Sequence, residues 1–395
     1  MPAAGIIAEY NPLHWGHLHL LREARRRLGS ETAVICVMSG NFVQRGDFAL
    51  TDKLARAAAA VQSGADLVLE LPLPWAIGPA ETFARGAVEL LKATGIVTHL
   101  VFGSEGGEAA PLVRLAQVLL SDAFPPLLRR ELARGDSFAA ARQRAAAILL
   151  SPEEAQALAR PNDILGVEYC KALAETGISP VAVARRGSGH DAGTADGFSA
   201  SAIRDLIRRG NEAAALERMA PAMAEAYRAE AAAGRAPALL NNCERAVLAR
   251  LRFMEEADFA ALDPGREGLY RRLFRASRSA PSVSELLETA KTKRYPMARL
   301  RRMTLWAYLG LPPAPEGAPP YLRLLAANGR GRVLLAEMRK RAALPVLTKP
   351  AAVRRMPPQA QRLLELEARA GRLYALACPN PAAAEDEWRR GPAIC

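Results

Sequence analysis

GIIAEYNPLHWGHLHLL, residues 5–21, decides the fold. Its apolar first part predicts a strand, which Asn11 and Pro12 end, and a helix then follows. Gly16, at the start of that helix, allows the backbone to approach a bound phosphate closely. The first amides of a helix have no partner within it, and together with the helix dipole they form an anion site. This stretch therefore predicts a nucleotide phosphate site at a strand-to-helix turn.

His14 and His17 are three residues apart, so both rings can reach one face of the helix. Two imidazole donors held in place can stabilise the charge that builds on an α-phosphate during in-line displacement. The alternatives are two surface histidines or a metal pair. A zinc pair usually sits at i and i+4 and needs a third ligand, and this chain has only His19, His99 and His190 besides. We expect a catalytic pair for adenylyl transfer and no metal site.

The composition describes a large protein without membrane or disulfide signals. A chain of 395 residues, half of them hydrophobic, predicts two or three domains. It has no run of about 18 uncharged apolar residues and no leader pattern at its N-terminus, so we expect a cytoplasmic protein. The five cysteines show no C-x-x-C spacing, which indicates ordinary thiols.

The net charge of +12 lies in the second half of the chain. Residues 1–210 carry 22 Lys plus Arg and 22 Asp plus Glu, whereas residues 211–395 carry 31 and 19. A neutral catalytic half joined to a basic half suits a nucleotide-using enzyme with a polyanionic second substrate. The alternative is an arginine-rich surface with no such role.

Strand-like and helical runs alternate in the first half. Strands are expected at 4–10, 31–40, 65–72, 99–104 and 179–188, with helices between them, which predicts an α/β fold with a Rossmann-like parallel sheet. An Ala, Leu and Arg-rich segment, about 108–158, predicts a helical insertion. From residue 211 the periodicity is mainly helical, with a strand-like run at 332–338. We expect a nucleotidyltransferase domain at 1–210 and a mainly helical, basic region at 211–395.

Further polar residues follow the predicted strands, where open α/β sheets bind their ligands. Gly103 ends a strand, and Asn162 either caps a helix or reads a base edge. Adjacent arginines after a strand, and a serine with an arginine on the first turn of a helix, suit phosphate groups. A glycine-containing polar loop at 38–57 adds a lysine. The candidate phosphate-binding residues are Lys53, Arg185, Arg186, Ser201 and Arg204.

These motifs together resemble the HIGH-motif nucleotidyltransferase superfamily, in which an H-x-G-H signature opens the chain. More narrowly, the chain resembles the bacterial tRNA(Met) cytidine acetate ligase family. IIAEYNPLHWGHLHL, MSGNFVQRGD, ADLVLELP, FGSE, PNDILGVEY and KTKRYPMARLRR match that family in order along nearly the whole chain.

The resemblance implies that ATP activates acetate as acetyl-adenylate, and that the acetyl group passes to N4 of the wobble cytidine of elongator tRNA(Met). His14 and His17 would be catalytic, and Mg²⁺ would bridge the phosphates. We expect no membrane and no stable protein partner. The implied ATP-binding residues are Ile7, Ala8, Glu9, Tyr10, Asn11, Pro12, Gly16, Leu20, Gly103, Asn162, Arg185 and Arg186. The basic residues expected to dock tRNA are Lys291, Lys293, Arg294, Arg299, Arg301 and Arg302.

Two other functions compete with the ligase hypothesis. One is a small-molecule adenylyltransferase of the same superfamily that forms a dinucleotide-type product, which has no use for a basic second half. The other is a nucleotide-dependent RNA-binding protein without turnover.

Overall fold

An eight-stranded sheet forms the centre of the molecule, and seven of its strands follow one another side by side. The computed structural model describes residues 3–135, 137–185, 199–263, 268–293, 295–312, 315, 317–381 and 386–395. Five parallel strands have the order β5-β2-β1-β6-β7, which is the doubly wound order of a Rossmann-like fold. Their bounds are β1 (Ala3–Ala8), β2 (Ala33–Ser39), β5 (Leu67–Leu71), β6 (Val97–Ser104) and β7 (Ser179–Ala184). The predicted parallel α/β fold is confirmed.

Hydrophobic packing covers both faces of this sheet. In β1, Ile7 belongs to one buried cluster and Ile6 to the other, because successive side chains of a strand point to opposite faces. Tyr10, just after the strand, has a positive φ of 46°.

The helices that follow the strands are α1 (Trp15–Leu28), α2 (Lys53–Gln62), α3 (Leu73–Ala76), α4 (Ala80–Ala93), α9 (Pro161–Leu173) and α10 (Ala200–Arg208). A small hairpin, β3 (Phe42–Val43) with β4 (Asp47–Phe48), lies between β2 and α2.

The second half of the chain also contributes to the sheet. Strand β8 (Leu322–Ala327) pairs antiparallel with β5, and β9 (Val346–Leu347) and β10 (Ala393–Ile394) pair with β8. The expected strand at 332–338 is wrong, because these residues lie in helix α18 (Gly329–Arg341). Asn328 starts that helix by accepting a hydrogen bond from the Gly331 N–H at 2.8 Å. The division of the chain at residue 210 stays a prediction.

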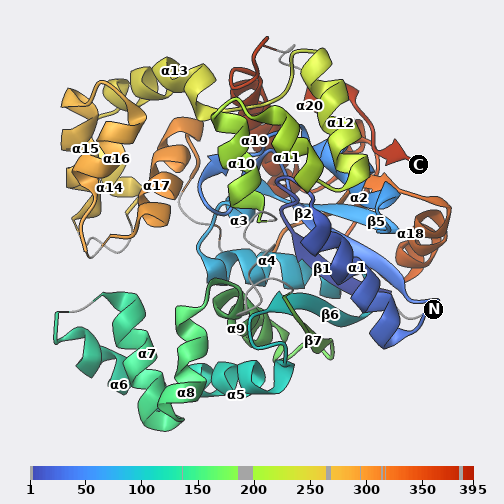
Figure 1. Cartoon of the computed structure of the whole chain (residues 1–395), viewed down its shortest axis with the longest axis horizontal. Helices are drawn as coiled ribbons and strands as arrows, with labels where there is room; N and C mark the ends of the chain where they lie inside the picture. The colour runs from blue at the N-terminus through green and yellow to red at the C-terminus, as the bar shows by residue number, and fades with distance from the viewer. Residues whose placement is uncertain are drawn as a thin grey trace.

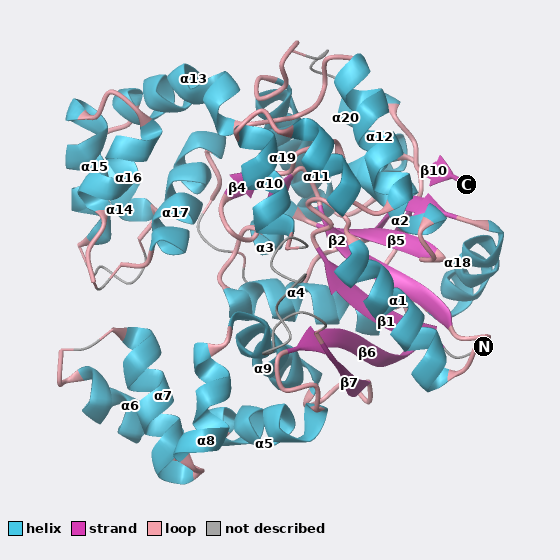
Figure 2. Cartoon of the chain, viewed as in Figure 1, coloured by secondary structure: helices cyan, strands magenta, loops and turns pink. Residues whose placement is uncertain are grey.

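Two helical lobes project from the sheet-containing part (Figure 1). The range of the predicted insertion holds α5 (Ala109–Leu120), α6 (Phe124–Leu132), α7 (Phe138–Leu149), α8 (Pro152–Ala155) and the 3₁₀ helix η1 (Gln156–Ala159). The second lobe holds α13 (Leu240–Phe253), α14 (Glu256–Ala261), α15 (Leu269–Ser279), α16 (Val283–Ala290) and α17 (Met297–Leu309). Figure 2 shows that the labelled strands lie outside these lobes.

The remaining helices pack around the sheet-containing part. They are α11 (Glu212–Arg218), α12 (Pro221–Ala232), η3 (Pro350–Arg355), α19 (Pro358–Ala375) and α20 (Asp386–Arg389). The five cysteines are free thiols, and of these Cys395 is exposed. Among the described residues, none of the helices combines the length and the apolar character needed to cross a membrane.

Candidate active site

A cavity of about 640 Å³ opens at the carboxyl ends of β1, β6 and β7, where the strand order reverses. Open α/β sheets bind ligands at this point of their topology. The starts of α1 and α10 complete its walls. The predicted site residues that line it are Ile7, Ala8, Glu9, Tyr10, Asn11, His14, Gly16, His17, Leu20, Gly103, Asn162, Arg185, Ser201 and Arg204.

Three residues predicted for the nucleotide site lie elsewhere or cannot be placed, and one residue predicted for RNA binding cannot be placed. Pro12 is buried and does not line the cavity. Arg186 and Arg294 lie outside the described residues. Lys53 is enclosed instead, because its ammonium lies 2.6 Å from a carboxylate oxygen of Glu70 and 2.6 Å from one of Glu387. These two carboxylates occupy Lys53, so the expected phosphate contact is not supported by this geometry.

His14 and His17 form the capping interaction that starts α1. Nδ1 of His14 accepts a hydrogen bond from the Gly16 N–H at 3.1 Å, and Nδ1 of His17 accepts one from the His14 N–H at 3.2 Å. In the neutral form of each ring, the proton therefore resides on Nε2. The ring centroids are 3.9 Å apart. The start of the helix thus provides two adjacent Nε2–H donors.

Both imidazoles are held in the neutral form. Burial lowers the pKa of His14 to about 4, and the nearby charges of Arg185 and Arg204 act in the same direction. Burial also lowers the pKa of His17 well below its usual value, with His14 and Arg185 contributing. Near pH 7 the pair can therefore donate hydrogen bonds without carrying a charge.

Arginines from two segments bring positive charge to the cavity. Arg204 of α10 donates to the backbone oxygen of Asn11 at 2.7 Å and to the Ser201 hydroxyl at 3.2 Å. Its buried Nε has no hydrogen-bond partner among the described residues. Arg45, from the β3–β4 hairpin, donates to the same Ser201 hydroxyl at 3.2 Å. Charged donors in this arrangement suit phosphate oxygens.

The start of α9 is organised by Glu105, which the sequence did not single out. Its carboxylate accepts hydrogen bonds from the Asn162 N–H at 3.2 Å, the Asn162 side-chain amide at 2.6 Å and the Asp163 N–H at 2.9 Å. Although burial opposes the shift, these bonds lower the pKa of Glu105. Asn162 also accepts from Arg185 at 3.1 Å. Asn162 therefore does not cap the helix, and it holds Arg185 at the cavity.

Arg56 is a second residue that sequence reasoning missed. It is fully buried, and its guanidinium donates to the backbone oxygens of Glu9, Ser39, Gly40 and Thr51. Glu9 and Ser39 lie at the carboxyl ends of β1 and β2. Arg56 therefore fixes two strand ends that carry loops of the cavity.

Those predicted RNA-binding residues that the structure describes lie at α17 and on the segment before it. Lys291, Lys293 and Arg301 are exposed. Arg299 lies 3.3 Å from a carboxylate oxygen of Asp263. Arg302 is half-buried, and burial, with the charge of Arg299, lowers its pKa to about 10. Lys291, Lys293 and Arg301 are therefore the most exposed of the described residues in this set, and Lys291 lies 3.6 Å from a carboxylate oxygen of Glu288.

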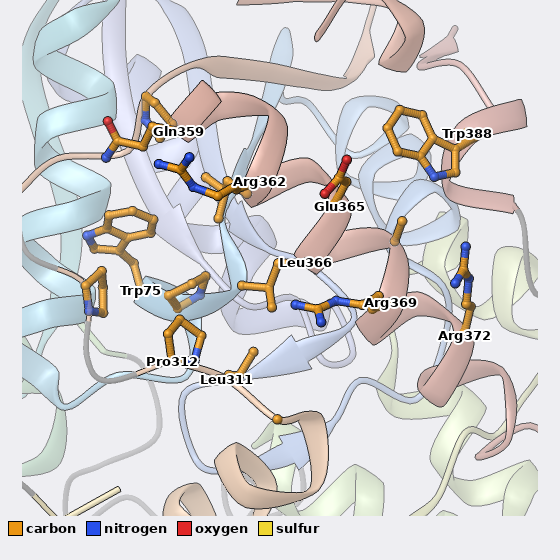
Figure 3. Close-up of a pocket in the computed structure, with 16 residues that line it drawn as sticks. Trp75, Leu311, Pro312, Gln359, Arg362, Glu365, Leu366, Arg369, Arg372 and Trp388 are labelled. Atoms are coloured by element: carbon orange, nitrogen blue, oxygen red, sulfur yellow. The ribbon is translucent and has the colours of Figure 1, made fainter. Parts of the chain in front are cut away.

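A larger cavity, of about 880 Å³, lies against α19 (Figure 3). Trp75, Trp388, Arg362, Arg369 and Arg372 are among its lining residues. Of the predicted nucleotide-binding and RNA-binding residues that the structure describes, none lines it. The larger of these two cavities is therefore not the one that the predicted site residues line.

A doubly wound sheet with a histidine pair at the first helix start is the arrangement of the HIGH nucleotidyl transferases. The sequence model described as HIGH Nucleotidyl Transferase matches residues 1–388. The tRNA(Met) cytidine acetate ligase of Syntrophomonas wolfei is 34% identical, over 97% of this chain and 96% of its own. That of Syntrophotalea carbinolica is 37% identical, over 96% and 95%. The chain belongs to the tRNA(Met) cytidine acetate ligase family.

Solved structures agree with this assignment. The crystal structure of Thermotoga maritima TmcAL bound with alpha-thio ATP matches with a TM-score of 0.92 and 33% identity, covering 100% of this chain and 99% of that chain. The apo form of the same protein matches with a TM-score of 0.93. The similarity therefore extends over the sheet and both helical lobes.

Proposed function

We propose that this protein activates acetate with ATP and transfers the acetyl group to N4 of the wobble cytidine, position 34, of elongator tRNA(Met). Family membership supports the overall reaction, since the relatives are named for it. The related Thermotoga protein is described as bound with alpha-thio ATP. The observation that carries the proposal is the neutral His14 and His17 pair in the cavity at the sheet's switch point.

In the first step, a carboxylate oxygen of acetate attacks the α-phosphorus of ATP. A new P–O bond forms, the bond from the α-phosphorus to the bridging oxygen breaks, and pyrophosphate leaves with that oxygen. The Nε2–H groups of His14 and His17 donate to the α-phosphate oxygens as negative charge builds there. Because both rings start neutral, they stabilise this charge without having to lose or gain a proton.

The arginines of the cavity have a separate role in this proposal. Arg204 has a buried Nε without a partner among the described residues, and Arg45 shares the hydroxyl of Ser201 with it. We assign these groups to the β and γ phosphates, which leave together as pyrophosphate. Arg185, held by Asn162, is assigned to the nucleotide as well.

In the second step, N4 of the cytidine attacks the acyl carbon of acetyl-adenylate. The N–C bond forms, the acyl C–O bond to phosphate breaks, AMP leaves, and the amine releases one proton. The exposed residues Lys291, Lys293 and Arg301 are proposed to hold the RNA for this step through its phosphates.

The described residues do not form a complete site for Mg²⁺. They contain no group of three or more His, Cys, Asp or Glu side chains that could hold a metal ion. Among the described residues lining the cavity, Glu9 is the carboxylate, and burial raises its pKa. If Mg²⁺ takes part, its ligands would have to come chiefly from the nucleotide and from water, and it would supply charge neutralisation for the phosphates.

The test supplies ATP, Mg²⁺, labelled acetate and unmodified elongator tRNA(Met). We expect label in the RNA at the wobble cytidine, and acetate-dependent exchange of pyrophosphate into ATP without RNA. A transcript with uridine at the wobble position is the matched control, because it lacks the N4 amine. Label that is equal in both transcripts, or exchange that ignores acetate and requires another metabolite, would refute the proposal.

A further inference from the structure

A smaller cavity lies beside the cavity of about 640 Å³ that His14 and His17 line, which we call the nucleotide cavity. It has a volume of about 300 Å³ and is enclosed by the β3–β4 hairpin, α13, α16 and α17. The two cavities share two structural elements. Arg45 lines the nucleotide cavity, and Gly46, the next residue, lines the smaller one. On α10, Arg204 lines the nucleotide cavity and Arg208 lines the smaller one. These two residues lie about 6 Å apart along the helix axis.

The close approach of the hairpin to α17 fixes this arrangement. Gly46 has a φ of +74°, and a Cβ added there would lie 2.5 Å from the backbone nitrogen of Arg302. A residue with a side chain would therefore push the hairpin away from α17. The smaller cavity thus lies between the β3–β4 hairpin and α17, the helix that carries predicted RNA-binding residues.

The lining combines buried apolar walls with a few polar groups. Phe48, Leu287 and Tyr308 line it and are each more than 90% buried. The Thr304 hydroxyl is buried without a hydrogen-bond partner among the described residues. The Asn241 side chain is exposed, and its amide offers both a donor and an acceptor. Such a surface suits a flat, largely apolar ligand with polar edges.

The charges of the lining argue against an anion inside the cavity. Asp47 and Glu244 are balanced by Arg208 and Arg301. Arg208 is already paired with Asp47 at 2.6 Å, and Glu244 accepts from the Val283 N–H at 2.8 Å. Arg301 is exposed, and no ion pair within the described part of the chain involves it. A neutral group therefore fits the interior, while Arg301 can hold an attached phosphate outside.

We propose that this cavity binds one unstacked nucleobase of the RNA substrate, next to the cytidine that is acetylated. Proteins that read single-stranded RNA loops turn bases out, pack them on aromatic or apolar side chains and bond their polar edges. The adjacency of the two cavities allows neighbouring nucleotides to occupy both. This inference rests on the proposed function, because it assumes that RNA reaches the nucleotide cavity.

Two substitutions on α16 provide a matched test. Ser284 is exposed and lines the cavity, so Ser284→Phe places a ring at its opening. Thr289 is exposed on the same helix and does not line the cavity, so Thr289→Phe is the control. Thermal unfolding checks that both variants are folded. Each is assayed with intact anticodon stem-loop RNA and with RNAs that lack the base immediately before or after the wobble cytidine.

We expect the wild type to lose roughly tenfold in kcat/KM when one of the two flanking bases is absent, as for the loss of a stacked base. Ser284→Phe should lose a similar factor with intact RNA and nothing further with that abasic RNA, whereas Thr289→Phe should behave as the wild type. The inference would be overturned if the kcat/KM losses from Ser284→Phe and from the missing base multiplied. It would also be overturned if Ser284→Phe behaved as the wild type.

The same comparison by RNA filter binding separates this inference from the proposed function. Binding does not require acetyl transfer. One outcome is that no RNA is acetylated, but Ser284→Phe still causes no further loss of affinity with the RNA that lacks the flanking base. The cavity then binds a base and the proposed reaction is wrong. The other outcome is that acetylation occurs, but removing the base and Ser284→Phe raise Kd independently. The proposed function then stands and the base site is wrong.

Discussion

The backbone N–H of His14 donates a hydrogen bond to Nδ1 of His17 at 3.2 Å, so the start of α1 and the chemistry of its side chains depend on each other. This bond occupies Nδ1 of His17, and the bond from the Gly16 N–H occupies Nδ1 of His14. Both rings consequently present Nε2–H groups. Cap geometry, rather than a neighbouring carboxylate, selects the tautomers.

Replacing either histidine with asparagine should remove catalysis and preserve the helix start. Asparagine is a good N-cap, so we expect His14→Asn to change the free energy of unfolding by less than about 1 kcal/mol. Loss of an oriented donor should lower acetate-dependent pyrophosphate exchange by about 10² or more for His14→Asn and for His17→Asn. Urea unfolding and the exchange assay measure the two effects. Exchange at the wild-type rate would show that the pair is not catalytic.

The low pKa values of the two histidines predict a flat rate in the neutral range. Burial, with Arg185 and Arg204, lowers the pKa of His14 to about 4, so the neutral donor persists well below pH 6.5. We expect exchange to be constant from pH 8 to about 6 and to fall as the pH approaches 4. Glu9→Gln is the control, because burial raises the pKa of Glu9, another titratable group of this cavity whose protonation could contribute to an acid loss. A loss centred near pH 6.5 would contradict the buried, neutral pair.

The same shift has a consequence for stability. Unfolded histidine binds a proton near pH 6.5, whereas folded His14 does so near pH 4, so between these values the unfolded state holds more protons. The stabilising contribution is complete above pH 6.5 and is lost as the pH falls toward 4. Urea unfolding of the wild type should therefore show a steeper acid loss than His14→Asn over this range.

Gly16→Ala should disturb the position of His14 without unfolding the protein. A Cβ at residue 16 would lie 2.9 Å from Cε1 of the His14 ring, so the ring must move. We expect the exchange rate to fall roughly tenfold or more, because small misplacements of catalytic groups are costly. Gly329→Ala is the matched control, since that glycine also begins a helix and a Cβ there would meet nothing within 4 Å. Equal rates for the two variants would argue against tight placement.

Short-range features of the site could be predicted from the sequence, and long-range ones could not. The strand, turn and helix around His14 are local, so spacing and composition were sufficient. Lys53 shows the limit, because one of its two carboxylate partners lies 334 residues away on α20. Arg56 gave no signal within its alanine-rich helix, because three of its four carbonyl partners, on Glu9, Ser39 and Gly40, are 16 to 47 residues away in the chain.

Charge reversal on the helical lobe should separate RNA binding from adenylate formation. Lys293 and Arg301 are exposed and do not line the nucleotide cavity. We expect Lys293→Glu and Arg301→Glu each to weaken RNA binding and to reduce the salt dependence of binding by about one ion. Filter binding at several salt concentrations measures this change. Arg129→Glu, an exposed site on α6, is the charge-matched control. RNA affinity reduced equally by all three variants would favour a diffuse charge effect over binding at this lobe.

Arg56→Lys should weaken the nucleotide site through the strand ends rather than through contact with ATP. Lysine keeps the charge but has one nitrogen, so it cannot reach the oxygens of Glu9, Ser39 and Thr51 together. Each buried oxygen left without a donor costs about 1–3 kcal/mol, so we expect a loss of at least about 2 kcal/mol in the free energy of unfolding. Without these bonds, the carboxyl ends of β1 and β2 are held less firmly. We therefore expect the KM for ATP to rise by a larger factor than kcat falls. Unchanged stability would show that other donors or water replace the guanidinium, and Arg56 would then have no positioning role.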